Sequence, residues 1–179
     1  MDRWFLNILS RNSRGQLLIE AMVAISVLMI GMMAVFGVLS QSMSLNRVAA
    51  DQYVAANLAS EGVEIIKNLV DSEYDPEYPT NFLAPVANLL GRTCVVDINF
   101  TSPAVCESPS DPLQFDKDGI YNLTGGSPTK FIRYVELSYN NDSGDEYIEV
   151  HSTVEWGRRG GVISDITVVD RLYNWRRGA

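Results

Sequence analysis

One carboxylate lies inside a long apolar run near the start of the chain. From Leu17 to Leu39 there are 23 residues, and Glu20 is the only charged one among them. As a helix, this run would be about 34 Å long, which is enough to cross the hydrocarbon core of a bilayer. Burying an unpaired carboxylate there costs on the order of 2.5–3.5 kcal/mol. We therefore expect Glu20 to have a partner inside the membrane or inside an assembly.

The residues before this run are basic and end in a glycine. They carry Arg3, Arg11 and Arg14 against Asp2 alone, and such an excess of positive charge favours retention in the cytoplasm. Gly15 has no side chain, so a protease can approach the backbone closely there. The pattern predicts a cytoplasmic leader over residues 1–15, followed by one membrane-spanning helix and an exported domain.

This arrangement resembles the class III signal of type IV prepilins and pseudopilins, in which a short basic leader and a glycine precede one variable residue, three apolar residues, a glutamate and a long apolar run. The resemblance implies that a prepilin peptidase cuts between Gly15 and Gln16 and methylates the new amino terminus. It also implies that Glu20 pairs with the Gln16 amino group of a neighbouring subunit. The family usually has Phe where this chain has Gln16, so methylation stays open.

The resemblance further implies a function, partners and a location. The chain would be a minor pilin or pseudopilin of a type IV pilus, a type II secretion system or a competence machinery, without a cofactor or an enzymatic activity. Its partners would be prepilin peptidase, other pilin or pseudopilin subunits, an inner-membrane assembly platform and, before assembly, membrane lipid. It would start as a single-pass protein of the cytoplasmic membrane, with its amino terminus inside, and end in an extracellular or periplasmic filament.

Two other interpretations of the amino terminus compete with this one. An ordinary secretory signal has a shorter apolar region and small residues before its cut, and this chain fits neither condition. An uncleaved signal anchor fits the length and the arginines but leaves Glu20 unexplained. In that case the exported domain would be an extracytoplasmic binding protein that is neither cleaved nor polymerised.

The elements expected to position these residues form an α+β, pilin-like fold. Residues 16–40 would form the membrane and assembly helix, and residues 41–70 its amphipathic continuation, because no proline occurs before Pro76. The continuation is expected to pack on its own sheet domain, since alanine fills coiled-coil core positions poorly. Its apolar stripe would comprise Leu45, Ala49, Ala56, Ala59, Val63, Ile66 and Val70, with the acids Asp51, Glu61 and Glu64 mostly away from it.

Residues 71–179 are expected to form an extracytoplasmic β domain. Apolar and polar residues alternate over 131–139, 147–156 and 162–173, which predicts three strands of an antiparallel meander with one face free to cover a helix. A further strand is predicted over 93–100. In the middle strand of the meander, one face would carry Ile148, Val150, Val154 and Trp156, and the other Glu149, His151 and Glu155.

Two cysteines, Cys94 and Cys106, lie in the part predicted to be exported, where oxidation is permitted. We therefore expect a bridge between them, which would stabilise the fold by roughly 3 kcal/mol. Two free thiols remain the alternative, because the spacing alone does not separate the two cases.

The charge of the chain disfavours nucleic acid as a partner. The formal net charge is −8, and removing the leader leaves 11 basic and 21 acidic residues, hence −10. Such a surface does not attract phosphate backbones. With one histidine and two cysteines, a structural zinc site is not expected.

The segment from Asp116 to Asn122 has oxygen-bearing side chains at the opening spacing of a calcium loop, with Asp116 and Asp118 as candidate ligands. The closing glutamate of such a loop is missing, since Ser127 stands in its place. A plain Asp-Gly turn is the competing interpretation, and we favour it.

Other candidate groups point to ordinary surface roles. His151 lies on the polar face of its predicted strand. The triplets 99–101 and 122–124 match glycosylation acceptors by chance. Basic charge gathers near the end of the chain, where it could bind acidic neighbours or lipid headgroups, although solvated strand ends explain it as well; the residues are Arg158, Arg159, Arg171, Arg176 and Arg177.

Overall fold

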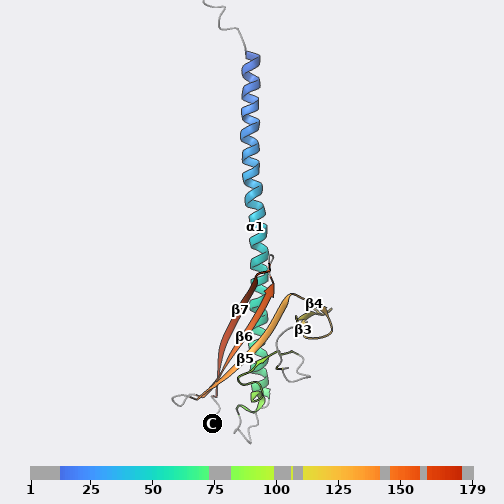
Figure 1. Cartoon of the computed structure of the whole chain (residues 1–179), viewed down its shortest axis with the longest axis vertical. Coiled ribbons are helices and arrows are strands. Elements are labelled where there is room, and N and C mark those ends of the chain that lie inside the picture. Colours follow the sequence, from blue (N-terminus) through green and yellow to red (C-terminus); the bar gives the residue numbers. More distant parts are fainter. Residues whose placement is uncertain are drawn as a thin grey trace, which may run out of the picture. The chain divides into compact units, whose positions relative to one another are not determined.

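The computed structural model describes residues 13–72, 82–98, 106, 111–141, 146–157 and 161–174. A long helix, α1, spans Ser13–Ser72, and its carboxy-terminal part packs on an antiparallel sheet (Figure 1). This is the α+β fold that the sequence predicts. By its contacts the chain divides into two units, Met1–Ala49 and Ala50–Ala179, and α1 contributes to both.

Helix α1 is longer at both ends than the predicted range of 16–70. It contains 60 residues, mostly alanine, leucine, methionine and other residues that tolerate a helix, and no proline. An acidic, proline-containing segment follows it in the sequence and lies outside the described residues.

The main sheet has the strand order β1-β5-β6-β7, and every pairing within it is antiparallel. Strands β5 (Phe131–Asn140), β6 (Tyr147–Gly157) and β7 (Ile163–Tyr173) form the predicted meander. The segments that join them lie partly outside the described residues. The predicted faces of β6 are confirmed, because its four apolar residues are buried and its charged residues are partly exposed.

The strand predicted over 93–100 is wrong in its length. Of the described part of this range, residues 93–98, only Thr93–Cys94 form a strand, β1, which pairs with Glu136 and Val135 of β5. Two positions further on, the carbonyl of Val96 accepts a hydrogen bond of 3.1 Å from the Arg133 side chain. Continuing the register of β1 and β5 would place Val96 opposite Arg133. The Val96 carbonyl is therefore bound by an arginine side chain at a position where the predicted strand would have a backbone hydrogen bond.

A second, small sheet lies in a region where the sequence predicted no strands. Its order is β3-β2-β4, with β2 at Gln114–Phe115, β3 at Tyr121–Asn122 and β4 at Ser127–Pro128. Backbone hydrogen bonds join it to the start of β5, because Leu113 donates to the carbonyl of Phe131 and accepts from the amide of Thr129. A short 3-10 helix, η2, spans Ala84–Val86.

Two apolar clusters form the core between α1 and the sheet. The first contains Ala55, Leu58 and Ala59 of α1 with Leu113, Phe131, Val154 and Trp156. The second contains Val63, Ile65, Ile66 and Val70 of α1 with residues of η2 and its neighbours, β1, β5 and β6. The burial of these side chains is the main favourable contribution to packing of the helix on the sheet.

The predicted apolar stripe of α1 is correct in its second half and wrong in its first. Ala59, Val63, Ile66 and Val70 are buried as expected. Leu45 and Ala49, by contrast, are exposed. The buried positions that the stripe missed are Ala55, Leu58, Gly62 and Ile65. The contact face is therefore rotated relative to the predicted stripe and begins further along the helix.

Candidate functional site

Glu20 lies in the amino-terminal part of α1 among exposed apolar side chains. Within the described residues it forms no hydrogen bond and no ion pair. Gln16 and Ala24 lie one turn away on either side, since residues four apart share a helix face. A charged side chain is thus held on an apolar helix surface, and this chain supplies no described counterion for it.

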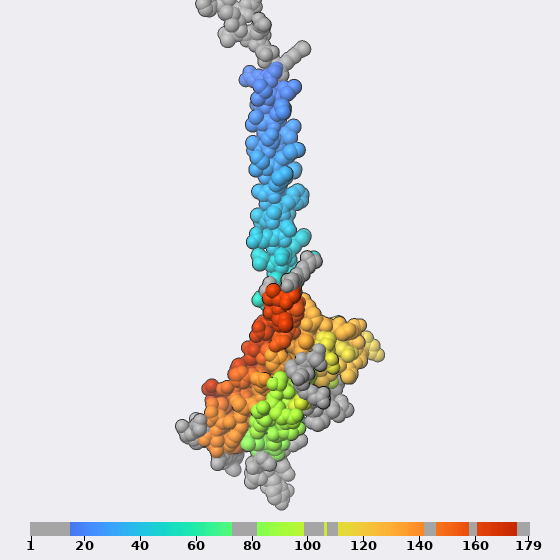
Figure 2. Space-filling model, viewed as in Figure 1, coloured from blue at the N-terminus to red at the C-terminus, as the bar shows by residue number. Residues whose placement is uncertain are grey.

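The apolar surface around Glu20 is continuous along the first unit. Every large apolar side chain from Leu17 to Leu39 is at least half exposed. Figure 2 shows this part of α1, in blue, with its side chains uncovered on the face in view. By length and composition α1 can cross a membrane, and it is the one helix in the described part of the chain that can. The hydroxyl of Ser26 donates to the carbonyl of Met22, so this polar group is satisfied inside the helix.

The predicted cleavage position lies inside the helix. Because α1 begins at Ser13, both Gly15 and Gln16 have helical backbones, and both residues are exposed. A peptidase can reach this bond from solvent or lipid, but it must first unwind the helix locally to bring the peptide into an active site.

A largely buried band of polar side chains separates the two apolar clusters of the second unit, and it consists of Glu61, Arg133 and Ser152. At its centre is Arg133 of β5, whose side chain is fully buried. Its guanidinium forms an ion pair of 3.1 Å with Glu61 of α1. It also donates to the carbonyls of Leu58, at 3.3 Å, and Val96, at 3.1 Å. Arg133 therefore connects the helix, β5 and the segment after β1.

Gly62 brings the helix backbone close to the sheet beside this arginine. A Cβ atom on Gly62 would lie 2.2 Å from the Ser152 hydroxyl and 3.3 Å from Arg133 Cδ. Glycine is thus required by space at this position, not by backbone conformation. The Ser152 hydroxyl and the Arg133 Nε are buried without a hydrogen-bond partner among the described protein groups, so the band is incompletely satisfied.

A second ion pair joins the same two elements. Lys130, just before β5, pairs with Asp51 of α1, and its amine lies 5.4 Å from the centre of the Phe131 ring. The expectation that Asp51 and Glu61 lie away from the contact face is therefore wrong, because both acids reach the edge of that face and meet cations of the sheet.

The sequence contains a signal for this band in the alternation of β5. Arg133 alternates in step with the buried residues of β5 and therefore faces inward with Phe131, Val135 and Leu137. A charged residue at an inward position needs a partner in the facing element. The acid one helix turn from the buried Leu58, which is Glu61, is such a partner.

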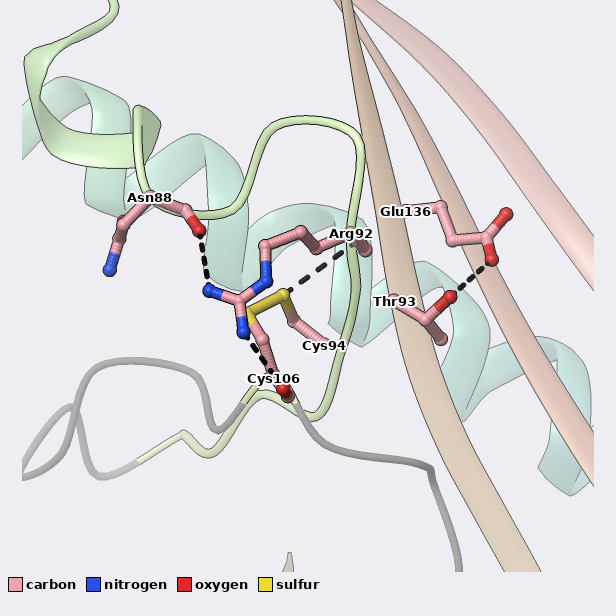
Figure 3. Close-up of a disulfide and its surroundings, with 6 residues drawn as sticks. All are labelled: Asn88, Arg92, Thr93, Cys94, Cys106 and Glu136. Carbon is pink, nitrogen blue, oxygen red and sulfur yellow. Dashed lines mark hydrogen bonds between the residues drawn. A yellow bond between two sulfur atoms is a disulfide. The ribbon is translucent and has the colours of Figure 1, made fainter.

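The predicted disulfide between Cys94 and Cys106 is present (Figure 3). Cys94 is fully buried, and the bond ties residue 106 to the edge of the main sheet. The Arg92 guanidinium lies between the two segments and donates to the carbonyls of Cys106, at 3.0 Å, and Asn88, at 3.5 Å. The bridge and the arginine together order an edge that has only a two-residue strand.

The calcium candidate is organised as a turn. One carboxylate oxygen of Asp116 accepts from the amides of Asp118, at 2.8 Å, and Ile120, at 3.0 Å, while the other accepts from the Asn122 side chain at 3.1 Å. Gly119 has a φ of +83°, which favours glycine. Asp116 thus caps the Asp-Gly turn. No group of three or more His, Cys, Asp or Glu residues that could hold a metal occurs in the described ranges.

The polar face of the sheet carries a network around Glu149. This carboxylate accepts from Arg171 at 2.7 Å and lies 2.9 Å from His151 Nε2. These contacts, first with His151 and then with Arg171, lower the pKa of Glu149. Nearby, burial and the hydrogen bond to Glu155 raise the pKa of Tyr134 to about 12. The network is partly exposed, so it organises the surface and contributes little to stability.

Several remaining sequence candidates are not accessible or fall outside the described residues. Asn122 is buried and bound to Asp116, so the triplet 122–124 is not an available glycosylation acceptor. The triplet 99–101 lies outside the described part of the chain. Of the five terminal arginines, Arg171 is engaged with Glu149, and the other four also lie outside it.

A cleft of about 320 Å³ lies between the end of α1 and the end of β7. Its lining combines apolar surface with two cations and two acids: Lys67, Val70, Asp71, Phe82, Asp170, Arg171, Leu172, Tyr173 and Asn174. It is large enough for a small ligand or a side chain of another protein.

Comparisons with family models, with curated proteins and with solved structures found no match for this chain.

Proposed function

We propose that this chain is a minor pilin or pseudopilin that is cleaved by a prepilin peptidase and assembled into a type IV pilus-like filament. The observation that carries the proposal is Glu20, a carboxylate without a described partner on an exposed apolar helix. A long amino-terminal helix packed on an antiparallel sheet is also what pilins look like, and this supports the same proposal.

In this proposal the leader holds the chain in the cytoplasmic membrane with the sheet domain outside. Cleavage after Gly15 exposes an amino group at Gln16. During assembly Glu20 of an incoming subunit pairs with the amino-terminal amino group of a neighbouring subunit, which joins two opposite charges in a region of low dielectric constant. Leaving either charge alone there would cost several kcal/mol, so the pairing selects the register between subunits.

The apolar helices would bundle as the filament core, with the sheet domains facing outward. Small residues support close approach of helices in lipid and in such a bundle. A Cβ atom added at Gly31 or Gly37 meets nothing within 4 Å in this chain, so both positions are open to a neighbour.

The amino terminus of the protein recovered from membranes, measured with and without prepilin peptidase, tests this function. A start at Gln16 only when the peptidase is present is the expected result. Gly15→Leu should block the cut, whereas Gly37→Leu, further along the same helix, should leave it intact. A start at Met1 in both strains would contradict the proposal.

Incorporation into filaments tests the role of Glu20. Glu20→Ala should be processed but largely absent from sheared or purified filaments. Glu64→Ala is the matched control, because Glu64 is an exposed acid of the same helix outside the apolar run. Normal incorporation of Glu20→Ala would remove the charge pairing from the mechanism.

The cleft at the end of β7 favours a second candidate, a signal-anchored extracytoplasmic binding protein. That protein would keep residues 1–15 and would not polymerise. The amino-terminal measurement separates the two candidates, because only the first requires the cut.

A further inference from the structure

We propose that the amino group exposed at Gln16 cyclises onto its own side chain and gives the mature chain a neutral pyroglutamate terminus. This inference rests on the proposed function, because it requires the cut between Gly15 and Gln16. It concerns what happens to the new terminus after that cut.

The reaction is intramolecular. The α-amino nitrogen of Gln16 attacks the side-chain carbon Cδ, a bond forms between these two atoms, and the bond from Cδ to Nε2 breaks. The amide nitrogen leaves as ammonia and takes up the proton that the amine loses. No oxidant, reductant or second substrate is needed. The attacking form is the neutral amine, and it is populated near neutral pH because α-amino groups titrate at about 7.7–8.0.

The geometry of α1 leaves the reacting groups free. Gln16 is exposed, and its side chain forms no hydrogen bond within the described residues. Because α1 begins upstream, at Ser13, Gln16 becomes the first helical residue once the leader is removed. The first four amides of a helix have no carbonyl partner inside it. Ring closure at Gln16 therefore breaks no hydrogen bond of the helix.

The product suits this position better than the free amine does. A pyroglutamate ring is a proline ring with one carbonyl, and proline is favoured at the first position of a helix. A protonated amine would place positive charge at the positive end of the helix dipole, next to the apolar run that begins at Leu17. Cyclisation removes that charge, as other modifications of an amino terminus do.

The modification changes what the subunit offers to its neighbours. Glu20, one turn along the helix, remains free to pair with the amino group of another subunit. The lactam offers no positive charge in return, so a cyclised subunit can occupy only one end of a row of charge-paired subunits. Methyl transfer and cyclisation compete for the same nitrogen, and the Phe that the family usually has at this position can undergo only the first.

Mass analysis of the full chain from peptidase-containing membranes tests the inference. Free amines are labelled with an isotopic reagent at neutral pH before digestion, so that later cyclisation during handling is not counted. The expected terminal peptide begins at Gln16, is lighter by one ammonia and carries no label. In Gln16→Asn the amide is retained, but the side chain is one methylene shorter and a five-membered ring cannot close. That variant should carry a labelled or methylated amine.

The outcomes separate this inference from the proposed function. A wild-type chain that begins at Gln16 with a labelled or methylated nitrogen would overturn the cyclisation and leave the processing intact. A chain that begins at Met1 despite the peptidase would overturn both. If Gln16→Asn is not cut, Gln16→Phe serves as the variant that keeps an open amine, and a terminal mass deficit of one ammonia in that variant would also overturn the inference.

Discussion

Two glutamates of the same helix, Glu20 and Glu61, differ in what surrounds them. Glu61 meets the buried Arg133 at 3.1 Å at the edge of the contact between helix and sheet. Glu20 stands on an apolar surface, without a partner among the described residues. An acid paired within its own fold serves that fold, whereas an acid held without a partner on such a surface is available to another molecule. We therefore expect Glu61 to contribute to the stability of the fold and Glu20 to serve the assembly that we propose.

The largest expected effect comes from breaking the pair at Glu61. Arg133→Met leaves an acid and two carbonyls without their donor, so we expect a loss of about 3 kcal/mol in the free energy of unfolding. This is the lower end for a buried pair, because the Glu61 side chain is 29% exposed. Urea unfolding of the full chain in detergent, followed by circular dichroism, measures the loss.

A surface arginine supplies the control for Arg133. Arg171 also pairs with a glutamate, but its side chain is 55% exposed, so Arg171→Met should destabilise the protein much less than Arg133→Met does. Similar losses in the two variants would mean that burial does not distinguish these pairs.

The second expected effect is steric and concerns Gly62. Gly62→Ala would place a methyl group against the Ser152 hydroxyl, and we expect a loss of about 1–3 kcal/mol. Ser152→Ala should rescue much of this loss, because the closest remaining contacts are then near 3.3 Å. Gly37→Ala, in the open part of the helix, should be neutral or stabilising by up to about 1 kcal/mol. A stable Gly62→Ala protein would contradict the close approach.

A smaller effect is expected from pH. The contacts with His151 and Arg171 lower the pKa of Glu149 from its ordinary value of 4.5. A carboxyl with a lowered folded-state pKa stabilises the fold above its ordinary value, and this contribution is lost as the pH falls through the lowered pKa. The thermal midpoint of the wild type should therefore fall more than that of Glu149→Gln on acidification below about pH 4.5. Equal falls would show that the network contributes nothing.

The smallest effect on stability is expected at Glu20. Glu20→Gln should change the free energy of unfolding by less than about 0.5 kcal/mol, because it removes no contact within the described fold. The same unfolding measurement that detects Arg133→Met should not detect this variant. A clear destabilisation would show that Glu20 has a partner in its own chain and would erase its contrast with Glu61.

The elements with a strong repeating pattern could be predicted from the sequence, and those fixed by single contacts could not. Strands β5, β6 and β7 followed from alternation, and α1 from a proline-free apolar segment. The short β1 could not be predicted, because its end depends on which group binds the Val96 carbonyl. The strands β2 to β4 have two residues each, which is too short for an alternating pattern to repeat.

The candidate site divides along the same line. The apolar run and Glu20 are visible in the sequence as residue types at given spacings, and the disulfide is expected because both cysteines lie in the part predicted to be exported. The face of α1 that meets the sheet could not be predicted, because a stripe of alanines at helical spacing does not reveal the close approach that excludes a side chain at Gly62. Arg133 occupies an inward position in the alternation of β5, but alternation alone does not show which group pairs with a charged side chain there.

The packing of Trp156 gives this molecule an internal optical reporter. Its indole is 3% exposed, belongs to the same cluster as Ala55 and Ala59 of α1, and lies 6.2 Å from the Phe131 ring. The other two tryptophans, Trp4 and Trp175, stand near the two ends of the sequence, and the proposed cut removes the first. The emission wavelength of Trp156 therefore reports whether the helix is packed on the sheet. The proposed cut removes Trp4, so the accompanying change in total fluorescence reports maturation.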